Sequence, residues 1–441
     1  MNNKKIFLFS AFAMLFSNAL FAQQTSYKFD FGTGKTAKGY INILPGSRFE
    51  DGKKYGFDFN SKVEGTEHAG KNVLTSDGVK SEKPFYFSAA VPEGNYEVTV
   101  TLGDEKEATS TTVKAESRRL MLENIKTKAG QFLTKTFIVN IKDRNITGGQ
   151  VVSLKPRELT KLDWDDKLTL EFDGKTVLAA LEIKKVENQI TVFLAGNSTV
   201  VNQEEEPWAS WGQMIPRFFK PGVAIANHAE SGLTLGSFLG SKRLTKVLSV
   251  MKPGDYLFVE FGHNDQKDKG PNDGAYKSYT ERLKTFITET RKKGGIPVIV
   301  TSTSRRSFDS TGKIQNTLGD FPDAARKVAK EENIALIDLN VMTAQLFNAL
   351  GEEQSKKALV HYPANSYPGQ DKPLADNTHF NPYGAYEIAQ CVILGIKNQK
   401  LGLIKYLVDD LPVFDPSEPD DLSVWKWPES PGSSLVKPDG N

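Results

Sequence analysis

The spacing of apolar and polar residues changes once along this chain, close to residue 188. Before it, short segments alternate apolar and polar residues, as in YEVTVTL at residues 96–102. A period of two is the pattern of strands with one buried face, and turn residues such as those at 92–94 and 173–174 separate them. Strands are predicted at residues 27–31, 55–59, 84–91, 95–102, 109–115, 119–125, 131–139, 168–172 and 176–185. No comparably long helical period occurs, so residues 23–187 are predicted to form a β-sandwich.

Residues 188–408 show another pattern, in which continuous apolar runs alternate with amphipathic segments. The apolar runs predict strands at residues 189–195, 223–227, 256–262, 296–301 and 334–339. Helices are predicted at residues 276–293, 321–332 and 382–397, and in the first of these Leu283, Phe286 and Ile287 share one face. This alternation is typical of a parallel sheet with helices on both faces. Residues 409–441, rich in Pro, Asp and Ser, are predicted to form an extended arm without chemistry of its own.

The first 22 residues have the order of a cleavable export signal. Lys4 and Lys5 precede an apolar-biased run over residues 6–16, and small residues lead to a predicted cut between Ala22 and Gln23. The run is too short to span a bilayer, so we expect export without membrane insertion. The single cysteine, Cys391, allows no intrachain disulfide, which favours a bacterial periplasm or cell exterior, and its apolar context predicts a buried thiol.

Charge and composition narrow the classes of partner. The formal net charge is +2 at pH 7, and loss of the leader's two lysines leaves the chain near neutral. A near-neutral chain has no electrostatic reason to bind nucleic acid or an anionic membrane surface. We find no Cys/His cluster with zinc spacing and no calcium-loop pattern, so we expect neither a metal nor another cofactor.

Residues with catalytic potential follow the predicted strands of the second domain. Ser198 follows the strand at 189–195, and Gly232 and Asn264 follow the next two. His379 lies three residues after Asp376, just before the last predicted helix. The carboxyl ends of parallel strands meet at one edge of a sheet, where ligands and reacting side chains collect. The sequence therefore predicts one site built from all five residues.

These residue types suit acyl transfer from an ester. His379 can take the proton of Ser198, while Asp376 can accept a hydrogen bond from the other ring nitrogen and stabilise the imidazolium. The resulting oxyanion needs donors, for which the Ser198 and Gly232 backbone N–H groups and the Asn264 amide are candidates. Gly232 suits this role because no side chain blocks approach to its backbone. The alternative is a set of unrelated polar loop residues, which the joint arrangement disfavours.

The order Ser, Gly, Asn and His resembles the SGNH, or GDSL, hydrolases over about residues 189–400. FLAGNSTV, WGQMIP, NHAESG, FGHND and DNTHFNPYGA look most like rhamnogalacturonan acetylesterases, and the N-terminal part looks like galactose-binding-like modules. The resemblance implies a three-layer α/β/α, flavodoxin-like domain and a Ser198–His379–Asp376 triad that removes acetyl groups from the pectin backbone. The family's Gly-Asp-Ser is Gly196-Asn197-Ser198 here. Because Asn keeps the size and one acceptor, we expect activity to survive.

Four further residues are candidates for substrate binding, namely His263, Arg305, Arg306 and Trp208. The two arginines follow the strand at 296–301 and can meet galacturonate carboxylates, although a solvated loop pair fits equally well. Helix packing is a stronger interpretation of Trp208 than a sugar platform. A structural hydrogen bond is likewise a stronger interpretation of His263 than catalysis. The acidic run at 204–206 argues against a uniformly basic cleft.

Three functions are compatible with these features. The first is a secreted esterase that removes O-acetyl groups from a plant cell-wall polysaccharide, with rhamnogalacturonan as the leading substrate. The second keeps the chemistry on acetylated xylan or a short-chain lipid ester, but polar strand-end loops and the added β-domain favour sugar. The third is a glycan-binding protein with an inactive hydrolase domain, which Asn197 alone supports and the intact triad opposes.

Overall fold

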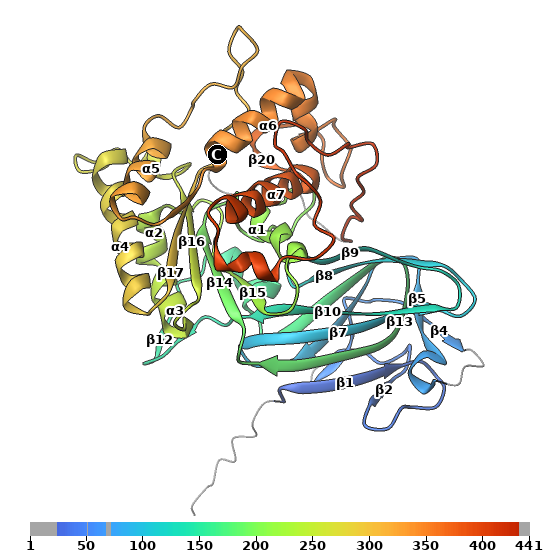
Figure 1. Ribbon diagram of the computed structural model, residues 1–441. Helices are drawn as coiled ribbons and strands as arrows, with labels where there is room; N and C mark the ends of the chain where they lie inside the picture. Colours follow the sequence, from blue (N-terminus) through green and yellow to red (C-terminus); the bar gives the residue numbers. More distant parts are fainter. Residues whose placement is uncertain (1–23, 51, 68–71, 432–441) are drawn as a thin grey trace, which may run out of the picture.

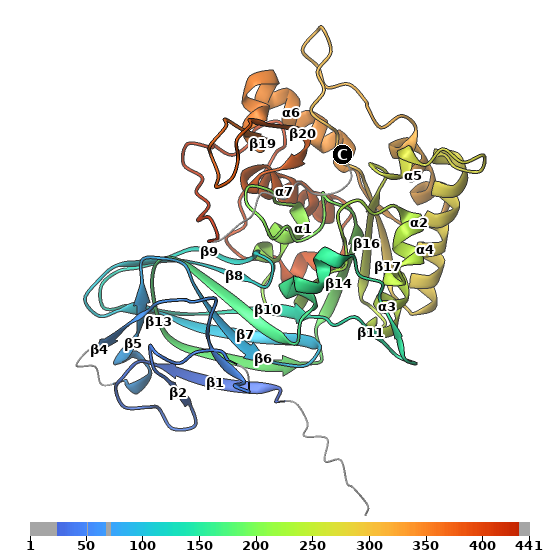
Figure 2. The same cartoon turned by 180° about the vertical axis from the view of Figure 1, so that it is seen from behind.

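The structure is a computed structural model that describes residues 24–50, 52–67 and 72–431 (Figures 1 and 2). The predicted export signal and its cleavage point lie outside these residues. An all-β domain and an α/β domain lie against each other in both views. No helix in the described ranges is long and apolar enough to cross a membrane.

The first domain consists of two mainly antiparallel sheets that share β13. The first half of β13 pairs with β6 and β8, and its second half pairs with β1, β5 and β7. Alternating positions such as Phe29, Phe87 and Val98 fill the core between the sheets. The strands are β1 (Ser26–Phe31), β2 (Ile41–Ile43), β3 (Tyr55–Asp58), β4 (Glu64–Glu67), β5 (Asp77–Ser81), β6 (Phe85–Ala90), β7 (Gly94–Asp104), β8 (Thr109–Ala115), β9 (Arg119–Thr127), β10 (Gln131–Ile141) and β13 (Lys167–Val186), with the small hairpin β11 (Asn145–Ile146) and β12 (Gln150–Val151).

The predicted turn at Asp173 and Gly174 is wrong, because β13 runs through both residues as one strand. Gly174 has a φ of +89°, which favours glycine, at the point where the strand passes from one sheet to the other. Asp173 is buried, with Oδ2 3.2 Å from Lys114 Nζ. The Asp-Gly pair therefore marks a bend inside a long strand, where a buried ion pair replaces the expected solvent contact.

The second domain has a five-stranded sheet in the order β15-β14-β16-β17-β18, with all neighbouring strands parallel. This order is flavodoxin-like and confirms the predicted fold. Val192 and Leu194 face one helical layer, whereas Phe193 and Ala195 face the other. The strands are β14 (Ile190–Gly196), β15 (Val223–Asn227), β16 (Tyr256–Phe261), β17 (Ile296–Thr301) and β18 (Ala335–Ile337).

Helices cover both faces of this sheet (Figure 1). The first face carries α1 (Trp211–Met214), α6 (Leu339–Gln354) and α7 (Pro382–Asn398), and the second carries α2 (Leu235–Gly240), α3 (Arg243–Val250), α4 (Thr280–Lys292) and α5 (Phe321–Glu331). The predicted helix at 276–293 begins instead with a π-helical turn at Ala275–Tyr279. Cys391 is buried within α7, as its apolar context predicts.

The segment that carries Asp376 and His379 differs from the expected loop after a parallel strand. Both residues lie on β20 (Leu374–Phe380), which pairs antiparallel with β19 (Leu359–Tyr362) in a separate ribbon. The four polar residues 376–379 bulge out of the ribbon, because Leu359 pairs with Phe380 while His361 pairs with Ala375. The triad candidates therefore lie between two paired ends of β20, and the strand leads directly into α7.

The C-terminal arm crosses both domains. Residues 409–431 contain neither helix nor strand, in line with an extended arm. Trp425 packs against Tyr383 and Tyr386 of α7, while Trp427 Nε1 donates to Glu206 Oε1 at 2.9 Å. Lys114 of β8 donates to the Pro428 carbonyl at 2.7 Å. The arm therefore ties the β-domain to the α/β domain.

Candidate active site

Three loops at the carboxyl ends of neighbouring strands build the site. Ser198 follows β14, Gly232 follows β15 and Asn264 follows β16. The chain runs from β14 outward to β15 on one side and later to β16 on the other, which makes β14 a switch point in the sheet. Asn264 Nδ2 donates to the carbonyl of Leu233 at 3.2 Å, so the second and third loops touch.

A hydrogen-bonded chain joins the three predicted triad residues. His379 Nε2 lies 2.8 Å from Ser198 Oγ, and His379 Nδ1 lies 2.8 Å from Asp376 Oδ2. Ser198 is 4% exposed, and the other two residues are also buried. When Nδ1–H donates to the carboxylate, Nε2 is the acceptor for the serine hydroxyl. This is the geometry that a general base needs.

The surroundings of Asp376 keep it ionised. Burial opposes ionisation, but the hydrogen bonds and charge of His379 and the Thr378 N–H outweigh it and hold the pKa of Asp376 below its usual range. Its Oδ1 accepts from the backbone N–H groups of Thr378 at 2.8 Å and His379 at 3.0 Å. The carboxylate is therefore fixed in charge and in orientation.

Side-chain hydrogen bonds fix the nucleophile loop around Ser198. Asn197 Oδ1 accepts from the Thr199 backbone N–H at 3.1 Å and from its hydroxyl at 2.9 Å, so Asn supplies the acceptor that the loop uses. The Ser198 carbonyl accepts from Gln203 Nε2 at 2.9 Å and from Ser210 Oγ at 2.7 Å. These bonds fix the backbone on both sides of the nucleophile.

Beneath this loop lies a fully buried carboxyl group that sequence reasoning missed. Glu260 accepts from Thr199 Oγ1 at 2.8 Å and from Trp211 Nε1 at 2.5 Å. Burial raises the pKa of Glu260 to about 7, because these neutral donors offset only part of the desolvation. The sequence contains one signal for this buried carboxyl group, namely a glutamate inside the apolar strand YLFVEF.

Gly232 and Asn264, two of the oxyanion candidates, lie in neighbouring strand-end loops. Gly232 has a φ of +77°, a conformation that favours glycine and directs the turn after Ser231. Asn264 is buried, and its Oδ1 accepts from Lys267 Nζ at 3.3 Å. Since one amide hydrogen of Asn264 meets the Leu233 carbonyl, the other can donate to an oxyanion.

The guanidinium group of Arg306 forms hydrogen bonds within the protein. Its Nε, Nη1 and Nη2 donate to Ser355 Oγ, Asn377 Oδ1 and the Glu352 carbonyl. Its backbone N–H also donates to the Asn377 carbonyl at 2.9 Å. Arg306 thus clamps β20 at the residue next to Asp376, and the geometry gives no support to the expected substrate contact.

The other three substrate candidates differ in exposure. Arg305 is half-buried, interacts electrostatically with Asp376 and donates to the His263 carbonyl at 3.4 Å. Burial, then the charges of Arg305 and His379, hold the pKa of His263 well below its usual range, so its ring is neutral. Trp208 is 2% exposed, which matches the packing interpretation over an open sugar platform.

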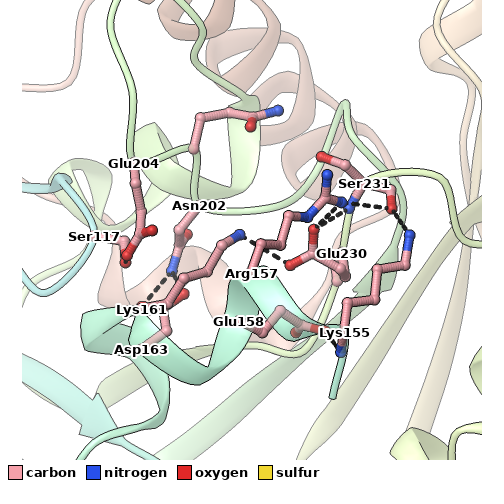
Figure 3. A network of polar contacts seen from close by, with 12 residues as sticks. Ser117, Lys155, Arg157, Glu158, Lys161, Asp163, Asn202, Glu204, Glu230 and Ser231 are labelled. Carbon is pink, nitrogen blue, oxygen red and sulfur yellow. Dashed lines mark hydrogen bonds and ion pairs between the residues drawn. The ribbon is translucent and has the colours of Figure 1, made fainter. Parts of the chain in front are cut away.

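A charged cluster around Glu230 was also missed by sequence reasoning (Figure 3). Glu230 is buried, and its carboxylate oxygens lie 2.6 Å from Arg157 Nη2 and 2.9 Å from Lys161 Nζ. Burial opposes ionisation, but Lys161 and Arg157 hold the pKa of Glu230 at about 2. Both cations come from the β-domain, 73 and 69 residues earlier, and no local pattern marks them as partners.

Comparison with known proteins agrees with this geometry. Residues 194–385 match the model of the GDSL-like Lipase/Acylhydrolase family. The chain is 41% identical over 225 residues to the rhamnogalacturonan acetylesterase RhgT of Bacillus subtilis (strain 168). The aligned residues cover 51% of this chain and 96% of RhgT. The chain belongs to the GDSL-like lipase/acylhydrolase family. As a GDSL hydrolase, it is a carboxylic-ester hydrolase.

The β-domain of this GDSL hydrolase also has relatives. Residues 27–150 match a family described as Beta-agarase/YXIM esterase-like, galactose-binding domain-like. The uncharacterized esterase YxiM of Bacillus subtilis (strain 168) is 28% identical over 397 residues, which cover 87% of this chain and 93% of YxiM. The crystal structure of the YxiM protein superposes with a TM-score of 0.45 at 26% identity, covering 86% of this chain and 99% of that one.

Proposed function

We propose that this GDSL hydrolase is an exported bacterial esterase that removes O-acetyl groups from rhamnogalacturonan by a serine acyl-enzyme mechanism. The observation that carries the proposal is the chain Ser198–His379–Asp376, with both contacts at 2.8 Å. The substrate follows from the 41% identity with a rhamnogalacturonan acetylesterase. The strand-end loops that surround the nucleophile are polar, which favours a carbohydrate ester over a lipid.

In the first half of the reaction, Ser198 Oγ attacks the acetyl carbonyl carbon while His379 Nε2 takes the hydroxyl proton. The carbonyl electrons move to oxygen, and the oxyanion accepts from the Ser198 and Gly232 backbone N–H groups and from Asn264 Nδ2. Asp376 stabilises the imidazolium at Nδ1. Collapse of the tetrahedral intermediate breaks the ester bond, and Nε2–H protonates the departing sugar oxygen.

In the second half, water replaces the sugar alcohol. His379 Nε2 takes a proton from water, whose oxygen attacks the carbonyl carbon of the acetyl-serine. The second oxyanion uses the same donors, and its collapse releases acetate while Nε2–H returns a proton to Ser198 Oγ. The triad ends in its initial protonation state, so no cofactor is consumed.

The test measures acetate released from acetylated rhamnogalacturonan, acetylated xylan and 4-nitrophenyl acetate by the wild type and by Ser198→Ala. We expect the wild type to release acetate from the pectic polymer and the small ester, and Ser198→Ala to release none. Release from xylan in preference to the pectic polymer would keep the triad and overturn the substrate. If the wild type released no acetate from any of the three substrates, the esterase mechanism would be overturned.

Export is tested on the protein that host cells secrete. A mature N-terminus at Gln23, read by N-terminal sequencing of the periplasmic or extracellular fraction, is the expected result. Recovery of the chain only from the cytoplasm, with Met1 still present, would contradict this part of the proposal.

A further inference from the structure

A cavity of about 170 Å³ lies beside Gly232, between the two domains. One wall is the 3₁₀ helix η2 (Pro156–Thr160) of the β-domain, which contributes Arg157 and Thr160. The opposite walls belong to the α/β domain and include Gln203, Trp208 and Ser231. Neither domain encloses this space alone.

This cavity adjoins the two loops that carry Ser198 and Gly232. Gln203 lines it and also donates to the Ser198 carbonyl at 2.9 Å. Ser231 lines it and directly precedes Gly232, whose N–H we assign to the oxyanion hole. A group held in the cavity would therefore lie next to the residue whose ester Ser198 attacks.

Charged side chains of both signs line the cavity, among them Arg157, Lys161 and Glu204 (Figure 3). Arg157, whose side chain is 28% exposed, donates to the Ser231 carbonyl at 3.1 Å and pairs with Glu230. Burial raises the pKa of Glu204 to about 7, so near neutral pH this carboxyl can both donate and accept. Two cations, Arg157 and Lys161, and three carboxyl groups line the space, so there is no excess of positive charge to select a carboxylate.

Such a lining fits a ring of hydroxyl groups without a charge. Most side chains around the space end in polar or charged groups, and a sugar residue presents hydroxyl groups around its edge that can form hydrogen bonds with them. Resting on the acetylesterase function proposed above, we propose that this cavity is a subsite for one neutral sugar residue of the acetylated polysaccharide, assembled jointly by the two domains. The β-domain thereby takes part in substrate recognition at the catalytic centre.

The first test blocks the cavity from its exposed rim. Thr160 is solvent-exposed and lines the cavity, so Thr160→Trp places an indole at its mouth without disturbing a core. The matched control is Leu159→Trp, which changes the neighbouring residue of η2, 61% exposed and outside the cavity lining. The readout is the ratio of kcat/KM for the acetylated polymer to kcat/KM for 4-nitrophenyl acetate.

We expect Thr160→Trp to lower this ratio at least tenfold, mainly through KM for the polymer, and Leu159→Trp to change it less than twofold. Equal ratios for Thr160→Trp and the wild type would overturn the subsite. An equal fall in both variants would also overturn it, because the effect would then belong to the surface of η2 and not to the cavity.

The second test is independent of catalysis. Saturation-transfer NMR with the intact protein compares methyl α-L-rhamnoside and methyl β-D-galactoside with D-galacturonate. We expect a neutral glycoside to bind the wild type and Leu159→Trp, and to lose its signal in Thr160→Trp. Preference for galacturonate at this site would overturn the neutral assignment. Neutral-sugar binding by a wild type that hydrolyses no ester would overturn the proposed function and keep the subsite.

Discussion

Asp376 and Glu260 are both buried carboxyl groups next to the nucleophile loop, yet their surroundings shift their pKa values in opposite directions. Asp376 on β20 faces His379 and two backbone N–H groups, and its pKa falls below the usual range. Glu260 on β16 faces the hydroxyl and indole donors of Thr199 and Trp211, and burial raises its pKa to about 7. The carboxyl group that is paired with His379 stays charged, and the one that supports the loop changes its charge around neutral pH. Burial alone therefore does not decide the charge of a carboxyl; its hydrogen-bond donors do.

Removing the charge of Asp376 tests the first half of this comparison. We expect Asp376→Asn to lower kcat for 4-nitrophenyl acetate by about 10⁴-fold, because the amide favours the wrong tautomer of His379 and cannot stabilise the imidazolium. Steady-state kinetics with a circular dichroism check on folding measures this. A loss below tenfold in a folded variant would contradict the assigned role.

Asn264 tests whether the third loop contributes a donor of its own. We expect Asn264→Ala to lower kcat by about 10²–10³-fold with a small change in KM, since an oxyanion donor acts in the transition state. Asn264→Asp serves as the matched control, because it keeps the size of the side chain but replaces the donor by a carboxylate. Retention of full activity by both variants would remove Asn264 from the oxyanion hole.

Arg306 tests how the strand that carries Asp376 is positioned. If Arg306 clamps β20 through Asn377, Arg306→Gln should lower kcat by roughly tenfold and leave KM for the polymer nearly unchanged. A contact with substrate would give the opposite split, a raised KM with kcat preserved. Kinetics on the acetylated polymer separates the two, and Arg305→Gln provides the comparison with the half-exposed neighbour.

Glu260 tests the second half of the comparison through stability. Its folded pKa of about 7 lies above the ordinary value of 4.5, so its protonated form favours folding and stability is lost as pH rises from about 4.5 through 7. Glu260→Gln gives up one acceptor for Trp211 or Thr199, which costs about 1 kcal/mol at pH 5. We expect this deficit to shrink or reverse at pH 8, as measured by urea denaturation. The same deficit at both pH values would contradict the raised pKa.

Local pattern predicted most of the longer strands and, of the seven α-helices in the described residues, α4, α5 and α7. Period-two alternation and apolar runs located β7, β14, β15 and β17 to within two residues. This works because the faces of a strand that are buried decide which of its successive side chains are apolar. The missed single strand β13 shows the limit of that argument. An Asp-Gly pair is typical of a solvent-exposed turn. Here Asp173 is buried in a bend of β13, where it pairs with Lys114 of another strand.

The sequence by itself determined which residues are candidates for the site. Asp376 and His379 are three residues apart, and Ser198, Gly232 and Asn264 each follow a predicted strand, in the order that resembles the SGNH hydrolases. Only the tertiary structure decided which distant groups meet. Ser198 and His379 are 181 residues apart in the sequence but form a hydrogen bond. Arg306 donates to Asn377 of β20, and Glu230 forms ion pairs with two cations of the other domain. Ion pairs and hydrogen bonds between distant segments depend on how whole domains pack, and no periodicity in the chain encodes that packing.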